Sequence, residues 1–208
     1  KVEKEMQELR WQFLKTHNNS VVGILAALDI LYSVGSSYTR EEIHRVLNTV
    51  DSSLHGEPSY KELTELAENM YPVAKGEKYM DIELTDETGK TVHLSDYVKP
   101  GQYNMLEFWA SWCGPCMREM PNVVKLYKEC KGKNFEILGI SLDSSKEAWL
   151  GAVKKNNMKW PQVSELKMWV SEPAKLCNVR GIPYTVLLDP DGKVIALGLR
   201  GEELITKI

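Results

Sequence analysis

The sequence predicts an α/β protein, in which a mixed sheet is flanked by helices and preceded by a small all-α N-terminal segment. Residues 1–75 carry apolar side chains at spacings of three and four, which is typical of helices. From residue 76 short apolar runs alternate with helical patterns, and turn signals at 86–89 and 190–192 indicate two hairpins. We therefore expect a helical N-terminal subdomain over 1–75 and an α/β domain over 76–208.

The individual elements follow from these periodicities. In the first segment the pattern predicts helices over 4–16, 20–33, 39–47 and 59–70, with a capping box formed by Thr39 and Glu42. In the second part it predicts strands over 79–84, 91–94, 103–109, 135–142, 184–189 and 193–199. Helices are expected over 117–130, 146–156 and 172–177, and a last one from Glu202.

Composition excludes several classes of partner. The formal net charge is −3, which gives no electrostatic basis for binding nucleic acid or an anionic membrane surface. No apolar run approaches the ~20 residues that a membrane span needs. The chain starts without Met or a signal-peptide pattern, and we expect a processed fragment from which any export signal or lipid anchor could have been removed.

The segment Trp109–Cys116 carries the most informative chemistry, because it places two cysteines two residues apart after a buried strand. If a helix follows, Cys113 lies at its N-terminus, where unpaired N–H groups favour a thiolate. Pro115 falls in the first turn, where its missing N–H costs little. The position is therefore suited to a reactive sulfur.

Metal binding is the alternative reading of such a cysteine pair, because a C-x-x-C can be half of a zinc site. A second pair of ligands is lacking, since the other cysteines and the histidines are scattered: Cys130, Cys177, His17, His44, His55 and His93. We expect a redox dithiol with no metal and no other cofactor.

The run Phe108–Cys116 resembles the active-site segment of the thioredoxin superfamily. The segments 117–121 and 94–97 resemble its extracytoplasmic TlpA/ResA branch, and 139–143, 179–185 and 189–193 match further. The resemblance covers roughly residues 78–208. Residues 1–75 resemble, more weakly, the helical leader of some Bacteroidetes-type proteins.

This resemblance implies a thioredoxin-like fold and a thiol–disulfide oxidoreductase. It implies that Cys113 is the exposed nucleophile and that Cys116, more buried, resolves the mixed disulfide. Gly114 and Pro115 would set the reduction potential, and this pair resembles that of reducing thioredoxins. We expect reduction of protein disulfides in an extracytoplasmic compartment, periplasmic or membrane-anchored, with an upstream thiol electron donor.

Further site residues are implied by the same resemblance. Pro183 matches the family's cis-proline, and Ile182 would pair its backbone with an extended partner peptide. Trp112 is expected at the rim of the site, where it can contact a partner. An ordinary proline at a strand edge is the alternative for Pro183.

Two acids complete the expected site. Glu107 lies six residues before Cys113, where thioredoxins have a buried carboxylate, and burial would raise its pKa and suit it to accept a proton from Cys116. Glu119 matches an acid that tunes the cysteines in ResA-type proteins and lies three residues after Cys116. The alternatives are a Glu107 side chain that bends to a lysine or to water, and an exposed surface role for Glu119.

Two other functions remain to be weighed. The branch resembles peroxiredoxins (AhpC/TSA-like) in overall sequence, but a peroxiredoxin site needs a threonine three residues before its cysteine, and Ala110 stands there. A binding module, in which the helical segment is the working surface, remains open for residues 1–75.

Overall fold

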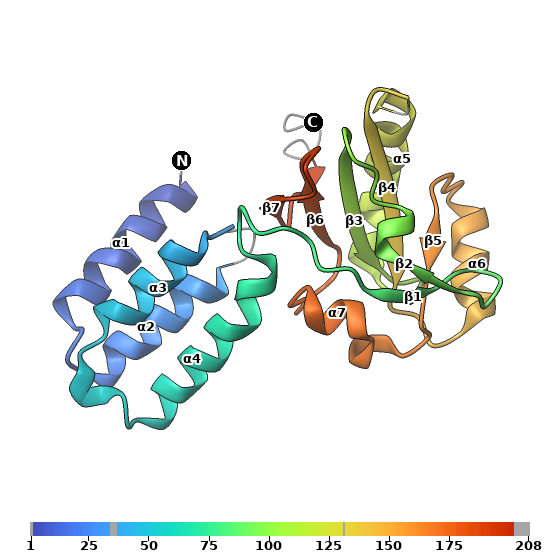
Figure 1. The fold of residues 1–208 in the computed structure, drawn as a ribbon. Helices are drawn as coiled ribbons and strands as arrows, with labels where there is room; N and C mark the ends of the chain where they lie inside the picture. Colours follow the sequence, from blue (N-terminus) through green and yellow to red (C-terminus); the bar gives the residue numbers. More distant parts are fainter. Residues whose placement is uncertain (1, 34–36, 131, 202–208) are drawn as a thin grey trace.

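The computed structural model describes residues 2–33, 37–130 and 132–201. The first part is helical, as predicted (Figure 1). Its long helices are α1 (Val2–Thr16), α2 (Val21–Tyr32), α3 (Arg40–Thr49) and α4 (Pro58–Met70). A short 3-10 turn follows α3 at η1 (Ser52–Leu54), and another follows α4 at η2 (Tyr71–Val73).

The capping box at the start of α3 is confirmed. Thr39 Oγ1 accepts a hydrogen bond from the Glu42 backbone N–H at 3.2 Å, and a Glu42 carboxylate oxygen accepts from the Thr39 N–H at 2.8 Å. Two otherwise unpaired backbone donors are thereby satisfied. Ser20, by contrast, precedes α2 without a side-chain capping bond.

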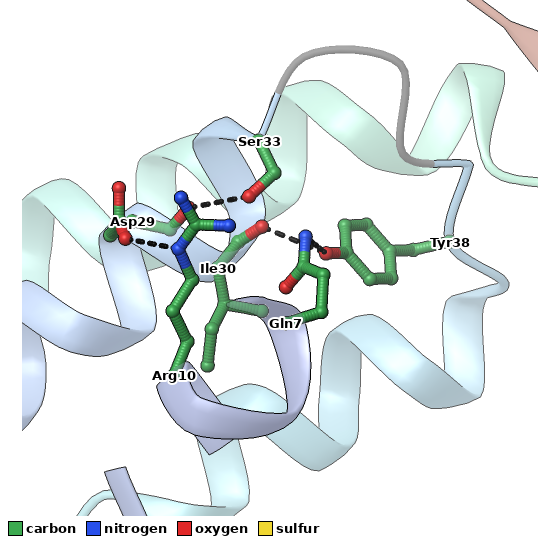
Figure 2. A network of polar contacts seen from close by, with 6 residues as sticks. All are labelled: Gln7, Arg10, Asp29, Ile30, Ser33 and Tyr38. Carbon is green, nitrogen blue, oxygen red and sulfur yellow. Dashed lines mark hydrogen bonds and ion pairs between the residues drawn. The ribbon is translucent and has the colours of Figure 1, made fainter. Parts of the chain in front are cut away.

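The helices pack around an apolar core of their own, which includes Leu14, Ile24, Ile30, Ile43 and Leu63, all fully buried. A polar network beside this core joins α1, α2 and the segment before α3 (Figure 2). The Gln7 amide donates to the Tyr38 hydroxyl at 3.2 Å, and that hydroxyl donates to the Ile30 carbonyl at 2.8 Å. Arg10 pairs with Asp29 in the same network.

The second part is built on a five-stranded mixed sheet in the order β5-β4-β3-β6-β7. Strand β3 lies at its centre, parallel to β4 and antiparallel to β6. Helices flank this sheet (Figure 1). The strands are β3 (Tyr103–Trp109), β4 (Phe135–Ser141), β5 (Gln162–Val163), β6 (Tyr184–Leu188) and β7 (Val194–Leu197), and the helices are α5 (Gly114–Cys130), α6 (Lys146–Lys155) and α7 (Glu172–Leu176).

A separate hairpin pairs β1 (Glu83–Thr85) with β2 (Thr91–His93). Short 3-10 turns follow β2 at η3 (Leu94–Asp96) and precede α7 at η4 (Met168–Val170). The strand predicted over 79–84 is wrong for most of its length, because β1 begins only at Glu83 and is preceded by an isolated bridge between Lys78 and Lys193. The predicted helix from Glu202 lies outside the described residues.

The helical segment is joined to the sheet by specific contacts. The Leu197 N–H of β7 donates to Ser37 Oγ at 2.7 Å, and the Arg180 guanidinium lies 4.5 Å from the centre of the Tyr32 ring. Across the described residues, we find no helix long and apolar enough to cross a membrane.

Candidate active site

The cysteine pair lies at the junction of β3 and α5. Strand β3 ends at Trp109, and α5 begins at Gly114, three residues earlier than the sequence predicts. Cys113 therefore directly precedes the helix and Cys116 lies in its first turn. The two residues form a disulfide, with their Cα atoms 5.2 Å apart.

The helix start is oriented to stabilise charge on Cys113. The backbone N–H of Cys116 donates to Sγ of Cys113 over 3.1 Å. When the disulfide is reduced, the same N–H and the positive end of the helix dipole favour a Cys113 thiolate. Cys113 is 4% exposed and Cys116 1%, so in the disulfide form the expected exposed sulfur is in fact buried.

The segment before β6 closes over the disulfide. The Ile182–Pro183 peptide bond is cis, which confirms that part of the prediction. The Ile182 carbonyl oxygen lies 3.6 Å from Cys113 Sγ, and Pro183 O accepts a hydrogen bond from the Arg200 guanidinium at 2.6 Å. The Ile182 backbone therefore lies directly beside Cys113 Sγ.

The two tryptophans of the motif have different environments. Trp109 is fully buried and its indole N–H donates to Gln162 Oε1 at 3.1 Å. Trp112 is 48% exposed, and its ring packs against Trp169 of η4 with centroids 6.2 Å apart. Met168, Trp169 and Val170 are exposed as well, so an apolar surface stands beside the disulfide.

Glu107 is buried in the middle of β3. In the sheet it is paired with Gly139 of β4 on one side and with Thr185 of β6 on the other. Burial raises the pKa of Glu107 to about 8, the indole of Trp160 offsets part of this rise, and the charge of Glu119 adds to it. A carboxyl with such a pKa can exchange a proton near neutral pH.

Glu119 lies on α5 and is half-buried. One of its carboxylate oxygens accepts a hydrogen bond from the Gly201 backbone N–H at 2.7 Å. The described contacts of this carboxylate are therefore with the loop after β7. The charge of Glu119 also raises the pKa of Glu107.

Asp143 is a site residue to which the sequence analysis gave no role. Its buried carboxylate accepts hydrogen bonds from the backbone N–H of Ser111 at 3.0 Å, from the Ser111 hydroxyl at 2.5 Å and from the Ser141 hydroxyl at 2.7 Å. These bonds fix the loop that leads to Cys113. The signal was available, because the carboxyl ends of two neighbouring parallel strands meet at one edge.

The remaining cysteines do not join the site. Cys177 is buried in apolar surroundings, which raises its pKa to about 12, and Cys130 is a free cysteine at the end of α5. Among the described residues no group of three or more Cys, His, Asp or Glu side chains could hold a metal ion.

A central sheet with a disulfide at the β3–α5 junction and an adjacent cis-proline defines a thioredoxin-like thiol–disulfide protein. The model of the AhpC/TSA family matches residues 75–197. The chain is 34% identical over 128 residues to the thiol-disulfide oxidoreductase ResA of Bacillus thuringiensis subsp. konkukian, a match that covers 62% of this chain and 70% of the relative.

Solved structures agree with this relationship. A thiol-disulfide oxidoreductase from Bacteroides fragilis superposes with a TM-score of 0.59 at 38% identity, over 63% of this chain and 96% of that one. The thioredoxin domain of an oxidoreductase from Bacteroides vulgatus gives 0.58 at 34% identity, over 64% and 94%. The chain therefore belongs to the AhpC/TSA family and is a TlpA/ResA-like thiol–disulfide oxidoreductase.

Proposed function

We propose that the chain reduces disulfides of extracytoplasmic proteins, with Cys113 as nucleophile and Cys116 as resolving cysteine. The observation that carries this proposal is the Cys116 N–H directed at Cys113 Sγ across the first turn of α5. This contact supports unequal roles for the two sulfurs, because the N–H favours negative charge on Cys113.

The reaction then takes two exchange steps. The Cys113 thiolate attacks one sulfur of the substrate disulfide, a bond forms between them, and the other substrate sulfur leaves as a thiolate that takes up a proton. Cys116 then gives its proton to Glu107 and attacks Cys113 Sγ. The substrate's remaining sulfur leaves as a thiolate and is protonated, and the Cys113–Cys116 disulfide is formed.

A protein substrate is favoured by the surface around the disulfide. Trp112 and Trp169 expose 48% and 41% of their surface beside the sulfurs, and large aromatic side chains dominate protein interfaces. The backbone of Ile182, next to Cys113, can pair with an extended segment as an added strand would.

The reducing direction is supported by the exposed Gly114-Pro115 pair, which resembles that of reducing thioredoxins. An upstream thiol donor would then restore the dithiol. Equilibration of the full chain with glutathione buffers tests this. We expect a reduction potential of about −270 mV, like that of thioredoxin. A potential of about −120 mV, like that of the oxidant DsbA, would contradict the reducing direction.

Peroxide reduction is the weaker candidate. Ala110 is fully buried at the place where a peroxiredoxin carries its threonine. We therefore expect hydrogen peroxide to oxidise the dithiol no faster than it oxidises a cysteine peptide of matched pKa.

The helical subdomain over 1–75 is proposed as a separate unit beside the thioredoxin-like domain over 76–208, since each has its own core. A binding role for it is favoured by a cavity of about 200 Å³ that Ser33, Met70, Arg180 and Tyr184 help to line, next to the cis-proline segment. A Ser33→Trp variant should weaken binding of a protein substrate and spare a small disulfide. Leu25→Trp, at an exposed position of α2, is the control.

A further inference from the structure

Three buried polar atoms on β3, on β5 and in the segment just before β5 have no hydrogen-bond partner among the described residues. They are Oε2 of Glu107, Nε1 of Trp160 and Nε2 of Gln162. Two are N–H donors and the third is an acceptor whenever Glu107 is ionised. Buried polar atoms are almost always paired, and an ordered water is the usual partner where protein atoms do not meet.

The sheet register places two of these side chains, those of Glu107 and Gln162, next to each other. Glu107 of β3 is paired with Gly139 of β4, and Gly139 with Gln162 of β5, so the three positions lie on one face of the sheet. A Cβ at Gly139 would lie 2.2 Å from Gln162 Oε1 and 2.6 Å from its Nε2. The amide of Gln162 therefore occupies the space that a side chain at 139 would take, directly beside Glu107.

The orientation of this amide is fixed. Gln162 Oε1 accepts the hydrogen bond of the Trp109 indole at 3.1 Å, which leaves Nε2 as the free end of the amide. The Trp160 indole is close enough to lower the pKa of Glu107, yet neither Trp160 Nε1 nor Glu107 Oε2 completes a hydrogen bond with the other. A group that bridges the three atoms must accept from two donors and donate to one acceptor.

We propose that Gln162 and Trp160 hold one ordered water against Oε2 of Glu107, and that Gln162 is thereby a positioning residue for this carboxyl. A water molecule has two lone pairs for the two N–H donors and donates a proton to the carboxylate. An effect of this water on turnover rests on the proposed role of Glu107 as proton acceptor. The presence of the water at Oε2 is a separate claim that holds without that role.

Loss of either donor should make Glu107 hold its proton more tightly, because hydrogen bonds to the charged form favour that form. Among the described residues, the other ionisable side chain that acts on Glu107 is Glu119 of α5, whose charge raises the pKa of Glu107. Glu119 is unchanged in every variant compared below. The comparison between variants therefore isolates the contribution of the two donors.

The test is a titration of the Glu107 side-chain carboxyl by carbon NMR in the reduced full chain. Trp160→Phe removes one N–H and Gln162→Met removes the amide at similar volume. Both should raise the midpoint by about half a pH unit or more. Trp149→Phe is the matched control, because Trp149 also buries an unpaired indole N–H but lies on α6, and it should leave the midpoint unchanged.

Midpoints equal to that of the wild type in both Trp160→Phe and Gln162→Met would overturn the proposal. A high-resolution crystal structure gives a second readout: a density peak bonded to Oε2 and Nε2 supports the water, and a direct Nε2–Oε2 bond rules it out. The pH profile of insulin reduction separates the two claims. A moved Glu107 midpoint with an unmoved profile would keep the positioning role and refute the proton-acceptor function.

Discussion

The backbone N of Cys116 lies 3.1 Å from Sγ of Cys113 and its N–H donates to that sulfur, so the proposed resolving residue donates a hydrogen bond to the proposed nucleophile. This arrangement exists because α5 begins at Gly114, so that Cys113 directly precedes the helix and Cys116 lies in its first turn. It favours different chemistry at the two thiols although only two residues separate them.

Alkylation of the reduced protein should therefore proceed in a fixed order. At neutral pH we expect iodoacetamide to label Cys113 first, because its thiolate is favoured. Cys177 should stay unlabelled until the chain unfolds, since burial raises its pKa to about 12. Mass spectrometry of quenched samples measures the order, and faster labelling of Cys116 than of Cys113 would contradict the assignment.

Glu107 should make the folded protein less stable as the pH rises. Its pKa is about 8 in the fold and about 4.3 in an unfolded chain, so between these values the native state holds a proton that the unfolded state has lost. The free energy of unfolding should fall across this window by up to about 1.4 kcal/mol per pH unit, with no contribution below it and the full cost above it.

Replacement of the carboxyl removes that dependence. Urea denaturation of Glu107→Gln and of the wild type is compared from about pH 5 to about pH 8, which covers most of this window. The free energy of unfolding of the variant, relative to that of the wild type, should increase with pH. Glu129→Gln on the exposed side of α5 is the control. A constant difference between Glu107→Gln and the wild type at all pH values would refute the raised pKa.

Asp143 should matter for the stability of the fold. Asp143→Asn replaces an acceptor of three protein donors by an amide that cannot accept them all, so we expect a loss of about 2–3 kcal/mol in unfolding free energy. Ser141→Ala removes one of these bonds and should cost about 1 kcal/mol. Equal stability of Asp143→Asn and the wild type would show that this carboxylate does not anchor the loop before Cys113.

The exposed tryptophan of η4 should act on protein substrates alone. Trp169→Ala should raise the KM for insulin several-fold and leave reduction of a small aromatic disulfide unchanged, because it removes docking surface and leaves the sulfurs in place. Leu25→Ala removes a similarly exposed apolar side chain far from the site and serves as the control. An equal loss with both substrates would point to damage at the dithiol itself.

Much of the fold was predictable because the periodic signals are long. The helix bounds for 1–75 are within a few residues of those observed, and β3 is predicted at its observed ends. Strand β5 was missed, since two residues are too few for a period-2 pattern to appear. It forms because it pairs with β4 at the edge of the sheet, and the local sequence carries no strand pattern that predicts it.

The site was predictable where chemistry is carried by a local motif. Cys113, Cys116 and the cis bond before Pro183 follow from short segments, and the burial of Glu107 follows from its place in an apolar strand. Gln162 could not be placed in this way, and Asp143 could be placed only from the shared edge of two parallel strands. Their roles depend on strand register, which decides that a glutamine of β5 reaches over a glycine of β4.

The central claim is that Cys113 attacks and Cys116 resolves, and trapping of a mixed disulfide tests it most directly. A peptide disulfide is mixed with Cys116→Ser and, separately, with Cys113→Ser, and the adducts are located by mass spectrometry. We expect a stable adduct on Cys113 in the first variant and far slower adduct formation in the second. Adduct formation on Cys116 at an equal or greater rate would contradict the account.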